Sequence, residues 1–419
     1  MDSARRAVIT GIGLVSPLGL GVESHWTGLK QGLSPARRMT LFDTAHCTAK
    51  HAAWIDGWEP GRWIAPHRLK RMERFSQFAV VAGKLALEHA ALRLSPKSPN
   101  PRAGISLGTA LGGFAEGESQ HRRFLSAGVK GISPSLGVQV FPASAHGHLA
   151  IEFGITGPAT TNTNSCAAGN AAVGDALRMI QRGEADVVLA GAAEAPLSPL
   201  IFTAFDQLGA MSDWTGEDPS PAYRPWHRER SGFVMGEGAA MLVVESLAHA
   251  TARGAQVLAE ITGYAITTEA FHMSTPDPTG EALQRAMRLA LQDAGIRPEQ
   301  IDSVSAHASG TPANDVNELR QITAVLGETH ARSIPINGTK PFTGHTLGAA
   351  GAMEAATCVL AMQYGWVPPT LNLTDPEPFT AGFNLVPGEG QPHSLRHMMS
   401  ISLGFGGIDT ALVLSQFQG

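Results

Sequence analysis

The sequence predicts an α/β protein built of two α/β halves that meet near residue 255. Short β-rich runs alternate with helical patterns along the chain, and the same alternation starts again after residue 255. No low-complexity linker or charge run separates the halves, and hydrophobic residues make up 43% of the 419 residues. We therefore expect one compact unit with a generous core.

The N-terminal half, residues 1–255, begins with the strand-like run RAVIT. A helix is expected over residues 72–90, followed by a strand at AGISLG and a helix over residues 144–153. Another helix follows Cys166, and a buried strand is expected at ADVVLAG.

The C-terminal half, residues 256–419, begins with the strand-like run LAEITGYAI. The helix expected over residues 280–294 carries apolar side chains at helical spacing: Leu283, Met287, Leu291 and Ala294. A strand at DSVSAH, helices over residues 314–326 and 346–363, and a last strand in MMSISLGFGG complete the alternation. Glycines and prolines fall mostly at the turns between these elements.

Composition excludes several classes of protein. The formal net charge of −5 argues against nucleic-acid binding through a general positive field. The three cysteines, Cys47, Cys166 and Cys358, form no CxxC and no spacing typical of a zinc site or a disulfide framework, so we expect no metal and a reducing, cytoplasmic compartment. Uncharged apolar runs such as residues 187–193 are far shorter than the roughly 18 residues that span a membrane, so no membrane span is expected.

A glycine-rich turn after the first strand resembles a dinucleotide-binding fingerprint but lacks two residues of that motif. In TGIGLVSPLG, Ser16 occupies the third glycine position, and no acidic ribose partner follows about 20 residues later. A nicotinamide cofactor is therefore not expected.

Cys166 is the first candidate catalytic residue. The segment TNTNSCAAGNAAVGDAL places it between an extended stretch and a small-residue helix, so its sulfur should lie at a strand-to-helix turn. Amides at a helix N-terminus lower the pKa of a thiol and stabilise a nearby oxyanion, and the small residues after Cys166 leave room for a substrate. A buried, inert cysteine is the alternative interpretation.

Two histidines lie at similar turns. His307 follows a strand in SAHASGTPAND, and His345 stands at the start of a glycine-alanine helix in TKPFTGHTLGAAGAMEA. Each alone could be structural, but three such turns together favour a catalytic site, and histidine supplies the donor that carbanion chemistry needs. Lys340 and Glu354 flank His345, and as a buried pair they would hold its loop; a solvated ion pair is the alternative.

The segment SLGFGG, residues 402–407, is the last candidate part of the site. Its glycines allow backbone amides to approach a substrate closely. Phe405 among them is either a mobile gate or a core aromatic residue.

Together these motifs resemble the β-ketoacyl-acyl carrier protein synthases of the elongating type, including the ketosynthases of polyketide pathways. The matching segments are the region of Cys166, RPWHRERSGFVMGEGAAMLVVE at residues 224–245, the HxxGTPxND block at His307 and TKxxTGHxxGAAG around His345. The resemblance covers residues 3–417. It implies a thiolase-like fold of two similar halves in five α-β-α-β-α layers, usually as a two-fold dimer with active sites near the interface.

The resemblance also implies a ping-pong reaction that yields a β-ketoacyl-acyl carrier protein. Cys166 would accept the acyl chain from a phosphopantetheine thioester, while His307 and His345 bind the malonyl thioester carbonyl and assist decarboxylation. The backbone amides of Cys166 and Phe405 would form the oxyanion hole. No cofactor of the enzyme's own is implied, because phosphopantetheine arrives on the acyl carrier protein.

Further site residues follow from the resemblance alone. The pantetheine tunnel would be lined by Ser309, Thr311 and Thr275. The acyl pocket would be lined by Leu111, Phe205 and Leu403.

The sequence departs from the fatty-acid enzymes of this family at several positions. Ala308 and Ser309 replace the usual Gly-Thr, Leu403 replaces a usual Phe, and Ile401 and Asp409 replace usual asparagines near the gate loop. Basic residues suited to docking an acidic carrier protein are present at Arg68, Lys70, Arg71 and Lys130, whereas Gly131 and Gly209 stand where a positive charge is common. An ordinary solvated face is the alternative interpretation of the basic cluster.

Alternative functions remain open within the resemblance. The chain could be a general fatty-acid elongating synthase, or a dedicated polyketide or polyene ketosynthase that pairs with a chain-length partner. A homodimer and a heterodimer with a related ketosynthase-like subunit are both compatible with it. A non-catalytic partner subunit would lack the nucleophile at Cys166. A thiolase would require a second catalytic cysteine, and the paired histidines oppose that assignment.

Overall fold

A computed structural model describes residues 5–419. Residues 3 and 4 of the expected unit therefore lie outside the described residues. The N-terminal half of the sheet is ordered β1 (Ala7–Ser16), β9 (Gly238–Ser246), β7 (Val187–Glu194), β5 (Ala103–Gly108) and β6 (Ala159–Asn162). The β1–β9 and β9–β7 pairs are antiparallel, and the β7–β5 and β5–β6 pairs are parallel.

The strands of the C-terminal half repeat this arrangement. Their order is β10 (Ala259–Thr268), β16 (Ile408–Ser415), β15 (His397–Gly404), β11 (Ser303–Ser305) and β12 (Ile336–Asn337). Two antiparallel pairs are again followed by two parallel pairs. The β1–β10 pair joins the halves, and β2 (Gly19–Leu20) pairs with β1. The two halves thus share one topology.

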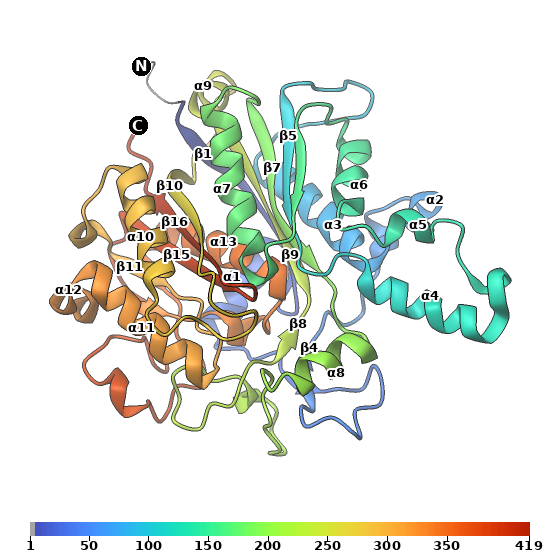
Figure 1. Ribbon diagram of the computed structural model, residues 1–419. Helices are drawn as coiled ribbons and strands as arrows, with labels where there is room; N and C mark the ends of the chain where they lie inside the picture. The colour runs from blue at the N-terminus through green and yellow to red at the C-terminus, as the bar shows by residue number, and fades with distance from the viewer. Residues whose placement is uncertain (1–4) are drawn as a thin grey trace.

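Helices cover both halves of the sheet and also separate them (Figure 1). The central helices α7 (Ala168–Gln181) and α13 (Ala350–Tyr364) contact each other and strands of both halves. On the outer sides, α3 (Arg74–His89) and α6 (Ser144–Phe153) cover the N-terminal half, and α10 (Glu281–Ala294) and α11 (Pro312–Leu326) cover the C-terminal half. The layers therefore run α-β-α-β-α, which confirms the expected fold class.

Burial patterns explain which helices are central. Every residue of α13 from Ala350 to Met362 is buried, as is typical of a helix enclosed on all sides. In α10 the buried residues form a single stripe, which includes the predicted Leu283, Met287 and Leu291. Close approach of the central helices needs small residues, because a Cβ on Gly169 would lie 2.4 Å from the backbone nitrogen of Ala352.

Most predicted helices lie within two residues of their expected bounds, and α6 spans the predicted residues 144–153. The helix expected over residues 346–363 begins later, because a 3₁₀ turn over Leu347–Ala349 precedes α13. Local sequence patterns do not predict the helices α1 (Gly21–Lys30), α4 (Phe114–Ala127), α8 (Pro199–Gln207) and α12 (Glu328–Ser333). In α4 only Gln120 is buried, so the helix carries no apolar stripe that periodicity could detect.

Short elements complete the fold. They are β3 (Arg37–Arg38), β4 (His51–Ala53), β8 (Met235–Gly236), β13 (Trp366–Val367), β14 (Gln391–Pro392), α2 (Pro66–Leu69), α5 (Leu136–Gln139) and α9 (Leu247–Ala252). Over residues 5–419, no helix has the length and apolar character needed to cross a membrane.

Candidate active site

The turn between β6 and α7 holds Cys166. The residue lies in a 3₁₀ turn, Ser165–Ala167, that leads directly into the helix, and it is buried. Ser165 has a φ of +49°, a left-handed conformation that is unfavourable for a residue with a side chain. Such strain persists only where the surrounding packing enforces it, and it is common at functional sites.

His307 follows β11, and its loop is fixed by a carboxylate from α11. Oxygen atoms of Glu318 accept the backbone N–H of His307 at 2.5 Å and that of Ala308 at 2.8 Å. Ala308 has a φ of +43°. Burial raises the pKa of Glu318 to about 7, although these hydrogen bonds oppose the rise.

His345 lies in the turn before α13 and is held by the β8 region. Its backbone N–H donates to the carbonyl of Val234 at 2.7 Å, and its carbonyl accepts the N–H of Gly236 at 2.9 Å. The ring of Phe233 packs edge-on against the imidazole, with centroids 4.9 Å apart. Leu347, two residues later, has a φ of +45°. A strained non-glycine residue therefore lies within two residues of each of the three predicted reactive side chains.

One cavity of about 350 Å³ unites these three turns, because Cys166, His307 and His345 all line it. The two imidazole centroids are 5.5 Å apart, and the ring planes are nearly perpendicular at 80°. Other predicted site residues that line this cavity are Thr275, Ser309, Thr311, Leu403 and Phe405. The structure therefore brings together the predicted nucleophile, histidines, tunnel residues and gate.

Leu111 and Phe205 are placed beside this cavity rather than in its wall. Both pack in the hydrophobic cluster that also contains Cys166 and Phe405. The ring of Phe205 stacks on that of Phe405 with centroids 6.2 Å apart. The backbone N–H of Leu111 donates to Glu194 at 3.1 Å, and the same carboxylate accepts the N–H of Gly348 before α13.

Lys340 and Glu354 form a buried ion pair with Nζ and Oε1 2.5 Å apart. Nζ also donates to the backbone carbonyl of His307. The side chain of Lys340 therefore binds the main chain of the His307 loop and links that loop to α13. Burial raises the pKa of Glu354 to about 7 against the opposing effect of Lys340.

Burial also decides the protonation of the reactive groups. It lowers the pKa of His307 and of His345 well below the ordinary value, and the positive charge of Lys340 adds to the effect. The pKa of Cys166 is raised to about 12 by burial, which outweighs the charge of Lys340 and a hydrogen bond from the backbone of Phe405. The expected lowering of this thiol pKa by the helix N-terminus is therefore wrong for the resting site. A neutral thiol faces two neutral imidazoles.

Sequence reasoning missed several groups around the cavity. Glu318 and Phe233 contact the histidines from distant segments, and no local pattern marks such contacts. Asp409, which the sequence marks only as a departure from the family, lines the cavity and is 1% exposed. Burial, followed by the charge of Glu269, raises the pKa of Asp409 to about 8.

Three of the four basic residues expected to contact a carrier protein are exposed. Lys70, Arg71 and Lys130 are exposed, whereas Arg68 is partly buried and forms an ion pair with Glu152 of α6. Arg68 is therefore less available to a partner than the sequence suggested.

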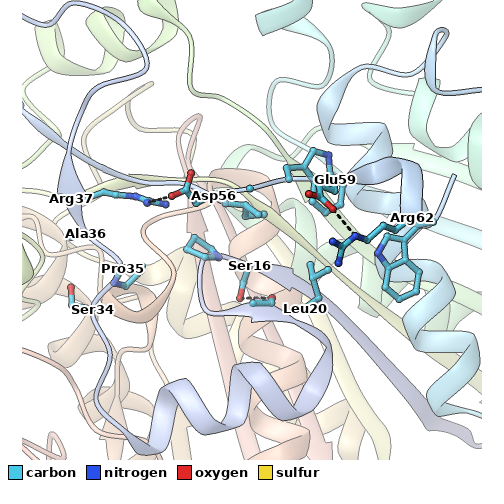
Figure 2. A pocket seen from close by; sticks show the side chains of 15 residues that line it. Ser16, Leu20, Ser34, Pro35, Ala36, Arg37, Asp56, Glu59 and Arg62 are labelled. Carbon is cyan, nitrogen blue, oxygen red and sulfur yellow. Dashed lines mark hydrogen bonds and ion pairs between the residues drawn. The ribbon is translucent and has the colours of Figure 1, made fainter. Parts of the chain in front are cut away.

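Another cavity, of about 770 Å³, lies apart from the one that holds Cys166 (Figure 2). Its charged side chains are paired: Arg37 contacts Asp56 at 3.1 Å, and Arg62 contacts Glu59 at 2.5 Å. No cysteine or histidine lines it. Within residues 5–419, no three His, Cys, Asp or Glu side chains are grouped as metal ligands. The reactive groups therefore converge on the smaller cavity.

Comparison with known proteins agrees with this geometry. Residues 4–250 match the family model of the β-ketoacyl synthase N-terminal domain, and residues 258–374 match that of the C-terminal domain. A 3-oxoacyl-(acyl-carrier-protein) synthase 2 of Staphylococcus aureus (strain COL) is 36% identical over 418 residues, 100% of both chains. The enzyme of the same name from Synechocystis sp. is 36% identical over 414 residues, 99% of each chain.

Two solved structures are also similar to this chain over nearly its whole length. The ishigamide ketosynthase/chain length factor superposes with a TM-score of 0.91 at 35% identity, covering 99% of this chain and 100% of that one. A type II PKS ketosynthase in complex with its acyl-carrier protein also gives a TM-score of 0.91, at 33% identity and the same coverage. Matches along nearly the whole chain, with Cys166 and both histidines on one cavity, show that this chain belongs to the β-ketoacyl synthase family.

Proposed function

We propose that this chain catalyses the decarboxylative Claisen condensation of an acyl thioester with malonyl-acyl carrier protein, giving a β-ketoacyl-acyl carrier protein. The observation that carries the proposal is the convergence of Cys166 with two neutral imidazoles on one cavity. Relatives named 3-oxoacyl-(acyl-carrier-protein) synthase 2 support acyl-carrier-protein-linked condensation in fatty-acid or polyketide elongation.

The first half-reaction transfers the acyl group to Cys166. The sulfur attacks the thioester carbon, a new C–S bond forms, and the old one breaks as the phosphopantetheine thiol leaves with the proton lost by Cys166. Because the thiol pKa is about 12, thiolate must form as substrate arrives, and a neutral imidazole in the same cavity is a suitable proton acceptor. The backbone N–H groups of Cys166 and Phe405 are proposed to stabilise the oxyanion.

The second half-reaction forms the carbon–carbon bond. His307 and His345 are proposed to donate hydrogen bonds to the malonyl thioester carbonyl, which stabilise the enolate left when CO₂ departs. The enolate carbon attacks the acyl carbon on Cys166, the C–S bond breaks, and the released thiolate takes up a proton from water to restore the resting thiol. Lys340 and Glu354 support this step by fixing the His307 loop through its carbonyl.

Thr275, Ser309 and Thr311 are proposed to bind the pantetheine arm. All three line the reactive cavity, and the hydroxyls of Ser309 and Thr311 are 2.9 Å apart. Such hydroxyls can exchange their mutual hydrogen bond for bonds to the amides of the arm. Leu403, with Leu111 and Phe205 behind Phe405, is proposed to bound the acyl chain. Phosphopantetheine is thus part of the substrate, and no cofactor of the enzyme's own is proposed.

Acyl carrier protein is the proposed partner, because one similar structure is described as a ketosynthase in complex with its acyl-carrier protein. A second candidate function is a dedicated polyketide or polyene ketosynthase working with a chain-length partner, which the likeness to the ishigamide ketosynthase/chain length factor favours. Homodimer and heterodimer both fit the proposal. A purely non-catalytic partner role is disfavoured by the nucleophile Cys166. The cytoplasmic location expected from the sequence stays a prediction.

We also propose that the unit, residues 3–417, divides into halves 1–255 and 256–419. The topology that repeats from β10 onward supports a boundary in the loop between α9 and β10.

The experiment that tests this function is intact-mass analysis after incubation with a panel of acyl-acyl carrier proteins. We expect a single acyl adduct on Cys166, and none on a Cys166→Ala variant. Subsequent malonyl-acyl carrier protein should remove the adduct and release a β-ketoacyl product. Acylation at another residue, or no acylation by any member of the panel, would contradict the proposal.

A further inference from the structure

A very small buried cavity adjoins the Lys340–Glu354 ion pair. Its volume is about 10 Å³, close to the least that holds one water molecule. It is enclosed by α1, by the turn that carries Lys340 and by α13. Its lining residues are His25, Thr339, Lys340, Thr343, Ala350, Met353, Glu354 and Thr357.

His25 presents a hydrogen-bond acceptor in this region. The hydroxyl of Thr357 donates to the carbonyl of Met353 at 2.8 Å, so its oxygen is left to accept from Nε2 of His25 at 3.1 Å. Nε2 therefore carries the proton, and burial lowers the pKa of His25 to about 4, which keeps the ring neutral. Nδ1 then bears a lone pair, and it is buried with no hydrogen-bond partner among the described residues.

Glu354 presents a second acceptor in the same wall. Its Oε1 binds Lys340 at 2.5 Å, while its Oε2 is buried and finds no partner within residues 5–419. When Glu354 is ionised, a molecule with two donor hydrogens would satisfy both acceptors on this small cavity, and buried polar groups are costly when unsatisfied. Lys340 has one N–H left after its bonds to Glu354 and the carbonyl of His307, and Thr339 adds a hydroxyl to the wall, but neither group binds His25 Nδ1 or Glu354 Oε2.

We propose that His25 is a positioning residue that holds Glu354 through one buried water, which donates to His25 Nδ1 and to Glu354 Oε2. The proposal deepens the proposed function and rests on it for the roles of His307 and His345. The water fixes the carboxylate, and the carboxylate anchors Lys340. Burial first, and then the charge of Lys340, lowers the pKa of both imidazoles.

Removal of the acceptor should therefore be felt at the imidazoles. In His25→Phe, the water loses a partner and the buried carboxylate is less well satisfied, which favours its protonated form. Lys340 is then less firmly anchored beside the imidazoles, so its charge lowers their pKa less, and the pKa of His307 and His345 rises. Protonated imidazoles stabilise the malonyl carboxylate before CO₂ leaves, so the acidic limb of decarboxylation should move up by about one pH unit.

The test compares the parent chain, His25→Phe and His25→Gln. A high-resolution crystal structure of the parent should show density for one water within hydrogen-bonding distance of both Nδ1 and Oε2. The rate of CO₂ release from malonyl-acyl carrier protein is followed against pH. His25→Gln, whose amide oxygen can accept the same hydrogen bond, should keep the parent profile, and His25→Phe should show the shifted limb.

Two results would overturn the proposal: a parent structure with no water bridging these atoms, or a folded His25→Phe variant with the parent profile. Thermal unfolding establishes folding, and if His25→Phe does not fold, the crystal structure of the parent still decides. If the parent releases no CO₂, that result counts against the proposed function and not against the buried water. The water is tested separately, because electron density in the cavity does not depend on activity.

Discussion

Cys166, His307 and His345 are all more than nine-tenths buried, and this burial governs their chemistry. A buried thiol and a buried imidazole both resist charge, so the resting site avoids the cysteine–histidine ion pair that an exposed pair would form. Charge must then develop during the reaction, where fixed amides and imidazoles are available to stabilise it. The positive end of α7 is proposed to contribute to this stabilisation, but it does not ionise the thiol at rest.

The buried carboxyl of Asp409 leads to a testable prediction about stability. Its folded pKa of about 8 lies above the unfolded value of about 3.9, so the fold favours the protonated carboxyl. The stability that this proton contributes is fully present below about pH 4 and is lost as pH rises through about 8. Asparagine resembles the neutral acid and does not titrate. Asp409→Asn should therefore raise the Tm relative to the parent, and more at about pH 9 than at about pH 5.

Thermal unfolding across this pH range measures the effect, with the exposed Asp213→Asn as the matched control. In a chain of 419 residues, each kcal/mol recovered should raise the Tm by about 1 °C. A Tm difference that is constant with pH, or that shrinks toward alkaline pH, would show that Asp409 is ionised in the folded protein.

At the scale of elements, the turns before α7 and α13 place the nucleophile and one histidine at the centre of the molecule. Ser165 and Leu347 begin the 3₁₀ turns that precede these helices, and both have left-handed φ. The helices then pack with almost no separation at their first turns, where a Cβ on Gly351 would lie 2.7 Å from the backbone nitrogen of Asn170. Packing of the central layer therefore fixes the distance between the two turns.

Gly169→Ala tests this link between packing and the site. The new Cβ would meet backbone atoms of α13, which cannot yield as a flexible side chain can. We expect a lower Tm, by the equivalent of about 1 to 3 kcal/mol, together with slower acylation of Cys166. Gly147→Ala in α6 is the matched control, because nothing lies within 4 Å of its Cβ. Equal stability of the two variants would contradict a packing constraint at the first turn of α7.

A further prediction concerns Leu403 and the preferred length of the acyl chain. It lies on β15 next to the gate segment, lines the reactive cavity and is paired with Asp409 on β16. Leu403→Phe adds a flat ring to the cavity wall, so it should shorten the preferred acyl chain by filling space. Relative rates of Cys166 acylation with a series of acyl-acyl carrier proteins measure the preference, and the shortest substrate serves as internal control. An unchanged profile would remove Leu403 from the acyl pocket.

The elements also show what local sequence patterns can and cannot predict. Helices α6 and α10 bury one regular apolar face, and their bounds were predicted to within a residue. The helix α4 was missed because it exposes Phe124 and Leu125 instead of packing them on the core. Cys166, His307 and His345 were predicted because each stands at a strand end or helix start. Glu318, Phe233 and His25 were not, because their roles depend on contacts between distant segments.

At the scale of the whole molecule, one topology occurs twice, and the site lies where the two copies meet. Cys166 precedes α7, and His345 stands at the corresponding place before α13. The loop after β11 adds His307 to the same cavity. The repeated strand order brings these turns together, which neither half achieves alone. Alternation of strands and helices predicted two α/β halves, but periodicity carries no information on which strands become neighbours, and the layered arrangement came from the family resemblance.

The two histidines are proposed to drive decarboxylation while Cys166 holds the acyl group, and CO₂ release by Cys166→Gln measures this division of roles most directly. The glutamine carbonyl can occupy the oxyanion hole as an acyl-enzyme carbonyl would, with no electrophile to capture the carbanion. Incubated with malonyl-acyl carrier protein alone, this variant should release CO₂ and acetyl-acyl carrier protein. His307→Ala should release CO₂ about 10² to 10³ times more slowly, because it lacks one stabilising donor. A folded Cys166→Gln variant that releases no more CO₂ than His307→Ala would contradict this division of roles.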